Sequence, residues 1–364
     1  MSLLIPQLPP NFQAALRDVQ ARRPESRIAA AERLGRADQS ERAPAIEGLG
    51  QLLADVHPGV RSSALMALGG LAADEVITLV IACLADEAAE VRELAALAVG
   101  QIGGERAIVA LREALGSLAP EVRFQAALAI SELAPETAVR DLTPLLKDAD
   151  AEVRAQVVCG LSGLDDTHLS GHFAGALTDS APVVRLEAAL ALAAVGDMRA
   201  EATLLQALEA RERVVEVAQA LAQLGSKPAI ERLARVAASF FTAQFVRAGV
   251  GAALVRLGDA RGPAALRRVL TGLRADARSY AVELVRETRA RDLVPELTRL
   301  AQRPRGADLL TVVDALATFA SESEPARRAL TALADRPDDV GARARRALQG
   351  TVFHENSLQM PVRA

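Results

Sequence analysis

The sequence has few aromatic residues. It contains no tryptophan, one tyrosine and eight phenylalanines among 364 residues, or 2% aromatics. Cages for cationic ligands and platforms for stacked bases are built from aromatic side chains. Enzymes that extrude a base from DNA also hold it against such groups. We therefore expect none of these three functions.

Cysteine and histidine are also scarce, with two and four residues respectively. Cys83 and Cys159 lie in separate apolar segments, and we expect both to be buried free thiols of a protein in a reducing compartment. His168 and His172 are four residues apart with two aspartates nearby, but the segment between them lacks the glutamate of a zinc-protease helix. We interpret them as polar residues of a surface hairpin. We predict no metal site, no cofactor and no catalytic residue.

Long apolar runs are absent as well. No run approaches the ~18 residues that a membrane-spanning helix needs. The first ten residues, MSLLIPQLPP, lack the basic region and the long apolar core of a signal peptide. We therefore expect a cytoplasmic protein without a membrane span.

What the sequence does contain is repetition. Residues 90–104, EVRELAALAVGQIGG, place apolar residues three, six, seven and ten positions after an arginine, which is the spacing of one helix face. The arginine recurs every 31 residues, apart from one interval of 62. Self-similarity at such a period indicates stacked repeats. The arginines of this register are Arg61, Arg92, Arg123, Arg154, Arg185, Arg247 and Arg278.

A second helical segment precedes each arginine helix, for example at residues 75–85, 105–116 and 136–147. A proline three residues before the arginine favours a helix start, as at Pro58. A glycine after the apolar stripe favours a helix end, as at Gly103. We predict an all-α fold of about eleven helical hairpins. The predicted boundaries are a tail at residues 1–9, one repeat domain at 10–350 and a second tail at 351–364.

These units resemble the HEAT-like repeats of the bacterial family first described in phycobilisome (PBS) lyases. Units of that family carry a proline in the first helix, an aspartate in the turn and Val-Arg at the start of the second helix. The matching prolines here are Pro44, Pro144, Pro228, Pro263, Pro295 and Pro325, and the matching aspartates, six residues before their arginines, are Asp55, Asp86, Asp148 and Asp179. The resemblance implies a right-handed α-solenoid, or superhelix. It also implies that these aspartates and the seven arginines form a ladder between neighbouring repeats.

The seventh repeat departs from the pattern. Val214 or Glu216 stands where the arginine is expected, and Phe240 and Phe241 lie at the turn that follows the next helix. The break is either a functional kink or sequence drift without consequence.

By the same resemblance, the second helices line a concave face. The positions one and five residues after each arginine point away from the core stripe. In the middle repeats they carry apolar side chains beside polar ones, which is typical of a binding surface. We predict a scaffold or adaptor that binds a helix or an extended segment of another protein there. The other interpretation is that neighbouring repeats cover these side chains. The predicted contact residues are Met66, Leu94, Leu97, Phe124, Gln125, Leu128, Gln156, Leu186, Glu187, Leu190 and Val215.

Charge offers one alternative function. Residues 1–182 carry a net charge of −10 and residues 183–364 a net charge of +6, with 12 arginines and 6 acids in 256–305. Arginine could contact phosphate, and nucleic-acid binding by the C-terminal third is one alternative. Acidic residues at helical spacing interrupt this patch and favour surface pairs with the arginines, so we do not expect a nucleic-acid partner.

A second alternative follows from the resemblance alone. A subunit of a phycobilin lyase or isomerase could hold a tetrapyrrole in an apolar groove. The sequence shows no distinct bilin-binding constellation, and we expect no small-molecule ligand.

Overall fold

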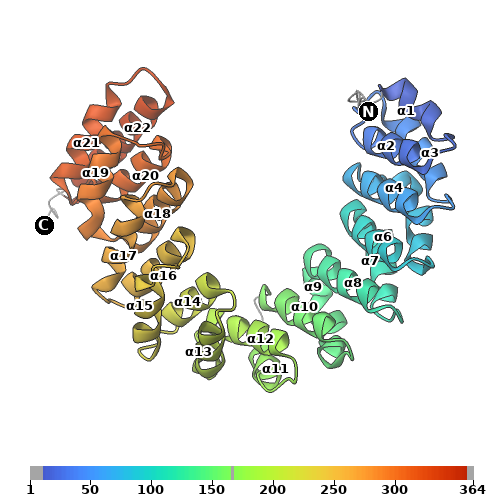
Figure 1. Cartoon of the computed structure of the whole chain (residues 1–364), viewed down its shortest axis with the longest axis horizontal. Coiled ribbons are helices and arrows are strands. Elements are labelled where there is room, and N and C mark those ends of the chain that lie inside the picture. Colours follow the sequence, from blue (N-terminus) through green and yellow to red (C-terminus); the bar gives the residue numbers. More distant parts are fainter. Residues whose placement is uncertain (1–10, 165–167, 359–364) are drawn as a thin grey trace, which may run out of the picture. The chain divides into compact units, whose positions relative to one another are not determined.

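The computed structural model describes residues 11–164 and 168–358 (Figure 1). All regular secondary structure in this part of the chain is helical, with 22 α-helices, five short 3-10 helices and no strand. The α-helices follow one another as eleven pairs joined by short turns, in agreement with the predicted number of hairpins. The predicted all-α fold of helical hairpins is therefore confirmed.

The chain divides into two compact units. Unit 1 ends at Ala191 and unit 2 begins at Leu192, within helix α12 (Pro182–Ala194). The last helix, α22 (Asp339–Leu358), continues eight residues beyond the predicted end of the repeat domain at residue 350.

Unit 1 contains six hairpins, and its second helices pack on one another in chain order from α2 to α10. Its first helices are α1 (Phe12–Asp18), α3 (Arg42–Leu52), α5 (Ile77–Ala82), α7 (Gly104–Ala114), α9 (Pro135–Leu142) and α11 (Leu169–Ala176). Its second helices are α2 (Pro24–Leu34), α4 (Pro58–Gly70), α6 (Ala89–Ile102), α8 (Pro120–Leu133), α10 (Ala151–Ser162) and α12. We call the side of the second helices that faces away from the first helices the second-helix face.

Unit 2 contains five hairpins, and its second helices also pack in chain order, from α14 to α22. Its first helices are α13 (Glu201–Ala210), α15 (Ala229–Ala238), α17 (Arg261–Leu270), α19 (Val294–Gln302) and α21 (Glu324–Ala334). Its second helices are α14 (Val214–Gln223), α16 (Gln244–Arg256), α18 (Ala275–Thr288), α20 (Leu309–Phe319) and α22.

Proline and glycine set several helix boundaries. Pro58 is the first residue of α4, where its missing N–H costs no helical hydrogen bond. Gly103 follows α6 with φ +69°, a conformation that glycine adopts without a steric penalty. The predicted helix 136–147 is divided, because α9 ends at Leu142 and a 3-10 helix containing Pro144 follows. The predicted helix 75–85 likewise consists of α5 between two 3-10 turns.

Small residues let the second helices approach closely. A Cβ atom added at Gly100 of α6 would lie 2.9 Å from the Cβ of Ala129 in α8, closer than two carbon atoms can pack. Leucines such as Leu65 and Leu68 of α4 are completely buried. The alanine-rich composition thus gives short distances between helices, with larger aliphatic side chains filling the core.

Candidate functional site

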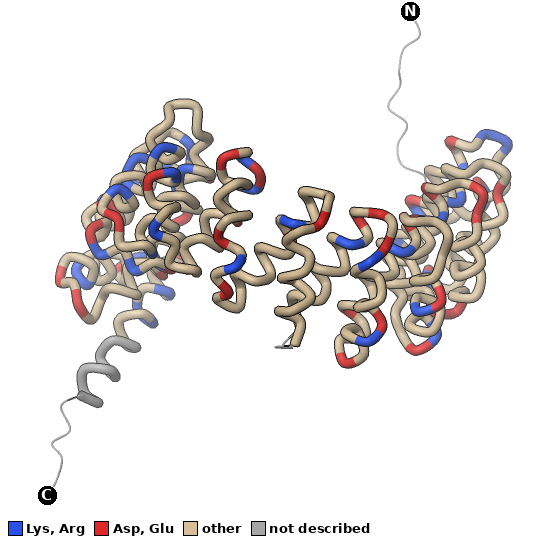
Figure 2. The backbone as a smooth tube through the Cα atoms, turned by 90° about the horizontal axis from the view of Figure 1, so that it is seen from below, with Lys and Arg blue, Asp and Glu red and all other residues tan. Residues whose placement is uncertain are grey.

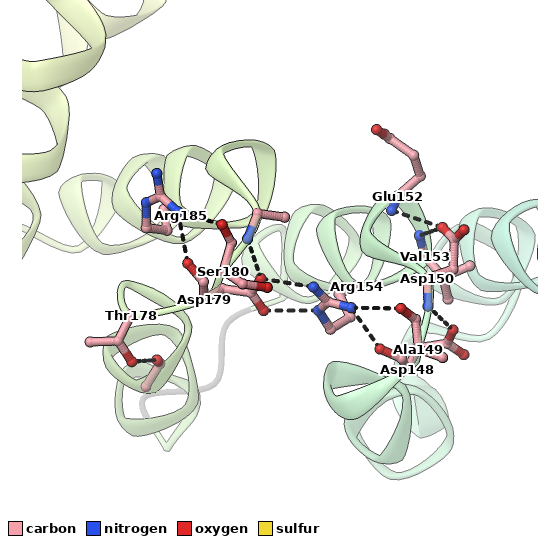
Figure 3. A network of polar contacts seen from close by, with 12 residues as sticks. Asp148, Ala149, Asp150, Glu152, Val153, Arg154, Thr178, Asp179, Ser180 and Arg185 are labelled. Carbon is pink, nitrogen blue, oxygen red and sulfur yellow. Dashed lines mark hydrogen bonds and ion pairs between the residues drawn. The ribbon is translucent and has the colours of Figure 1, made fainter.

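Arg154 of α10 connects two consecutive hairpins of unit 1 (Figure 3). Its Nε and Nη2 atoms each lie 2.8 Å from a carboxylate oxygen of Asp179, in the turn before α12. Its Nη1 atom donates to the carbonyl oxygen of Asp148 at 2.7 Å, within its own hairpin. The side chains of Arg154 and Asp179 are 12% and 14% exposed. One guanidinium therefore holds its own turn and the next turn in a fixed register.

The same arrangement recurs in unit 1. Arg61 binds Asp86 at 2.6 Å, and Arg123 makes a two-pronged pair with Asp148 at 2.6 and 2.7 Å. Arg27, which lies outside the predicted ladder, binds both carboxylate oxygens of Asp55. The partners are 25 residues apart for Arg61, Arg123 and Arg154, and 28 for Arg27.

Arg92 binds a different acidic residue. The position 25 residues after it is Ser117, and its guanidinium instead binds Glu121, in the first turn of α8, with Nε 3.0 Å from Oε1. A longer side chain one helical turn further on replaces the missing aspartate. The sequence register alone did not indicate this substitution.

The ladder of carboxylates ends at Arg185. The residue 25 positions further on is Ala210, and Nη1 of Arg185 donates to the carbonyl oxygens of Asp179 and Ser180, at 2.8 and 2.9 Å (Figure 3). In unit 2, Arg247 and Arg278 also donate to carbonyl oxygens, including those of Ala237 and Gly272. The ion pairs of the ladder thus belong to unit 1.

These contacts lower the pKa of the ladder carboxyls. The hydrogen bond from Arg154 is the main reason why the pKa of Asp179 lies below its ordinary value. Burial by itself raises the pKa of Asp148, but the hydrogen bond from Arg123 and the backbone N–H of Asp150 reverse that effect and leave it lowered. Arg247 donates to the carbonyl oxygens of Ala237 and Ser239 instead of to a carboxylate. Its burial lowers the pKa of its guanidinium.

The predicted contact residues of unit 1 occupy the second-helix face with graded exposure. Met66 of α4 is 62% exposed. The side chains of α6, α8, α10 and α12 are only partly covered, so neighbouring repeats shield part of each one and leave part accessible. This half-buried set is Leu94, Leu97, Phe124, Gln125, Leu128, Gln156, Glu187 and Leu190.

Three of the predicted residues meet at one pocket. Met66 of α4 and Leu94 and Leu97 of α6 line a pocket of about 60 Å³, together with Ala98 and Gln101. A polar contact lies one repeat away, where the side-chain amide of Gln125 in α8 is 3.5 Å from the carboxylate of Glu93 in α6. The arrangement is a small apolar recess with polar groups beside it.

Two predicted contact residues, Leu186 and Val215, do not lie on the accessible surface of unit 1. Leu186 is 6% exposed, so it is a core residue of its hairpin and not a surface anchor. Ser62 and Ala155 occupy the same position, one residue after the register arginine, and are buried too, so this position belongs to the helix packing in those repeats. Val215 lies in α14 of unit 2, half-buried beside Gly249 of α16.

The comparisons with known proteins agree with this geometry. Residues 46–131 match the family model of HEAT repeats, and residues 184–210 match that of the PBS lyase HEAT-like repeat. These residues form HEAT repeats. A comparison of the HEAT-repeat chain with curated proteins gives no match.

Solved structures support the fold of the HEAT-repeat chain. The X-ray structure of the E. coli protein YibA is similar with a TM-score of 0.51 and 22% identity, over 68% of this chain and 93% of YibA. Importin beta gives a TM-score of 0.52 at 12% identity, over 94% of this chain and 57% of importin beta. At these identities the similarity describes the fold alone.

Basic and acidic residues of the HEAT-repeat chain are interspersed along both units (Figure 2). In the arginine-rich part of unit 2, Glu283 pairs with Arg286, Glu287 with Arg256 at 3.4 Å, and the buried Glu296 with Arg267 at 3.0 Å. Three of the acids that interrupt the patch in the sequence therefore pair with its arginines.

His168, His172 and the two cysteines of the HEAT-repeat chain lie on ordinary surface and core positions. His168 and His172 are exposed at α11, and Asp165 and Asp166 lie outside the described residues. Where the structure describes the chain, no three metal-ligating side chains gather at one point. Cys83 is buried as expected, but Cys159 is exposed, because it lies five residues after Arg154 on the second-helix face.

The turn after α15 presents the pair Phe240 and Phe241, 80% and 91% exposed, with their rings edge to face at 5.7 Å. Just before α14, Arg211 and Arg213 adopt left-handed backbone conformations, which are uncommon for residues other than glycine. These are the local features of the seventh and eighth hairpins that break the regular register. Across the described residues, no helix combines the length and the hydropathy that crossing a bilayer requires.

Proposed function

We propose that the HEAT-repeat chain is a scaffold or adaptor that binds a helix or an extended segment of another protein on the second-helix face of unit 1. The observation that carries the proposal is the pocket between α4 and α6. Its volume of about 60 Å³ is far below the roughly 300 Å³ at which pockets for small organic ligands begin. The pocket is therefore suited to one aliphatic side chain of a partner.

The residues around the pocket favour a protein partner. Met66 has an unbranched, polarizable side chain that adapts to the shape of an opposing apolar group. The half-buried leucines Leu97, Leu128 and Leu190 each lie five residues after a register arginine, on α6, α8 and α12, and so continue the apolar strip. Gln125, Gln156 and Glu187 supply polar groups beside it, which can fix the register of a bound segment.

The ladder contributes rigidity. Each ion pair fixes one hairpin on the next, so the face is already formed before a partner arrives. A preformed surface lowers the entropy cost of binding. This is the role that we assign to the arginines of unit 1, and none of them is assigned a contact with the partner.

Site-specific photo-crosslinking in native lysate tests the proposal. A photoreactive phenylalanine analogue replaces Met66 in one variant and Val109 of α7, which is 51% exposed, in the matched control. We expect a crosslinked protein band that is specific to position 66. Bands of equal strength at both positions, or bands at position 109 alone, would contradict binding on the second-helix face.

A further inference from the structure

A second pocket lies in unit 2, between the ends of α17 and α19. Its volume is about 400 Å³, within the range of pockets that hold small organic ligands. Leu270 and Leu300 give it an apolar part. The charged residues that line it are Glu296, Arg299, Arg303 and Arg305. We call it the α17–α19 pocket.

Three of these charged residues lie on one face of α19 and its end. Glu296, Arg299 and Arg303 are three and four residues apart, which brings them to the same face of α19 and its end. Arg305 follows in the turn with φ +49°, an uncommon conformation for a residue other than glycine. Its carbonyl oxygen accepts a hydrogen bond from Nη2 of Arg278 in α18, which holds the turn in that conformation.

The charges of the α17–α19 pocket are not balanced. The Oε1 atom of Glu296 lies 3.0 Å from Nε of Arg267 and 3.4 Å from Nη1 of Arg299. Among the described residues, the side chains of Arg303 and Arg305 make no ion pair or hydrogen bond, although both line the pocket. Two guanidinium groups, each with donors arranged to match phosphate oxygens, are therefore available at one opening.

Glu296 provides a second and independent feature. Its side chain is 8% exposed, and no donor among the described residues lies within hydrogen-bond distance of its Oε2 atom. A buried carboxylate oxygen without a donor is costly, and a ligand that donates an O–H or N–H to it would recover that cost. Glu296 also lines the pocket, so the pocket brings together two guanidinium groups and a carboxylate that has an unfilled acceptor position.

We propose that the α17–α19 pocket binds a phosphate monoester that also carries a hydroxyl or amino group. The phosphate contacts Arg303 and Arg305, and the hydroxyl or amino group donates to Glu296. The phosphate monoester is either a free small molecule or a phosphorylated side chain of a protein. The proposal is independent of the second-helix face, which lies in unit 1.

Isothermal titration calorimetry on the full chain tests the site. The probes are O-phospho-L-serine, phenyl phosphate, and a short alanine-rich peptide with a central phosphoserine, with the same unphosphorylated peptide as its control. The pocket variant is R303A/R305G, with glycine at 305 because φ is positive there. The matched control, R235A/R346A, also removes two positive charges from exposed positions of unit 2.

We expect the pocket variant to lose about 10- to 100-fold in affinity for the phosphorylated probes, as two charge-assisted contacts disappear, and the control variant to lose less than about twofold. Equal losses in the two variants, or no binding of any phosphorylated probe by the unaltered chain at millimolar concentration, would overturn the proposal. Tighter binding of free phosphoserine assigns the site to a small molecule, and tighter binding of the phosphopeptide assigns it to a protein.

Glu296→Leu removes the acceptor that we assign to the ligand's hydroxyl or amino group, with circular dichroism as the check on folding. The unaltered chain should bind O-phospho-L-serine about tenfold more tightly than phenyl phosphate, which has no donor to offer Glu296. In the variant this preference should disappear while phenyl phosphate binding persists. A preference that is unchanged in the variant would refute the role of Glu296.

Discussion

Arg154 and Asp179 form a two-pronged ion pair across two consecutive hairpins, with both nitrogen–oxygen distances at 2.8 Å. The pair fixes α10 relative to the turn that precedes α12. It is the last arginine–aspartate pair of the ladder in unit 1, because Arg185, the next arginine of the register, has alanine where the aspartate would stand.

Replacing the acceptor of this pair should destabilise unit 1. Asp179→Asn leaves the mostly buried guanidinium of Arg154 without its carboxylate, and hydrogen bonds to charged groups are worth roughly 1.5–3 kcal/mol. We expect a loss of about 2 kcal/mol by urea denaturation, with faster hydrogen exchange in α10 and α12. Asp276→Asn breaks the exposed pair with Arg274 and should have a much smaller effect. Equal losses from the two substitutions would refute a structural role for the ladder.

The contribution of the ladder should depend on pH. Arg154 holds the pKa of Asp179 below its ordinary value. A carboxyl whose pKa is lower in the folded chain stabilises folding above its unfolded pKa of about 3.9, and this stabilisation is lost as pH falls through the folded pKa. The difference in unfolding free energy between the unaltered chain and Asp179→Asn should therefore be constant near neutrality and shrink below about pH 4. A difference that stays constant down to pH 2 would contradict this linkage.

Two glycines should respond to alanine in opposite directions. Gly100 lies so close to Ala129 that a Cβ atom forces α6 and α8 apart, which costs about 1–3 kcal/mol. Gly171 of α11 has no atom within 4 Å of the equivalent position, so alanine there should add about 0.5–1 kcal/mol through helix propensity. Thermal unfolding of Gly100→Ala and Gly171→Ala measures both changes. A loss of stability at both positions, or at neither, would show that contact between second helices does not decide the result.

The two cysteines should differ in reactivity. Burial raises the pKa of the Cys83 thiol to about 11, so only about one molecule in a thousand carries a thiolate at pH 8. Cys159 is exposed. A thiol reagent should label one cysteine per folded chain quickly and the second only after denaturation. In Cys159→Ser the fast phase should vanish, and its persistence would mean that Cys83 is accessible.

The sequence was sufficient to predict the hairpins and the arginine register, because each depends on local spacing. The arginine positions follow from a 31-residue period, and the starts of α4, α8 and α12 follow from their prolines. Contacts that depend on neighbouring repeats were harder to predict. The pairing of Arg92 with Glu121 required the distance between two hairpins.

Burial on the second-helix face shows the same limit. Leu186 and Leu190 both follow Arg185 at positions that point away from the core stripe of an isolated helix, yet Leu186 is buried and Leu190 is half-buried. A single helix cannot show which of its outer positions a neighbour will cover. The α17–α19 pocket also escaped prediction, because it depends on the left-handed turn at Arg305 and on its bond to Arg278.

Affinity capture from native lysate with Met66→Glu tests whether a partner binds on the second-helix face. Met66 is 62% exposed and Val109 is 51% exposed, so a glutamate at either position should leave the fold intact, and Val109→Glu serves as the control on the first helices. We expect a partner protein to be retained equally by the unaltered chain and by Val109→Glu. Its recovery with Met66→Glu should be at least about tenfold lower, because a charge in the apolar recess costs more than about 1.4 kcal/mol. Equal recovery with all three chains would contradict binding on this face.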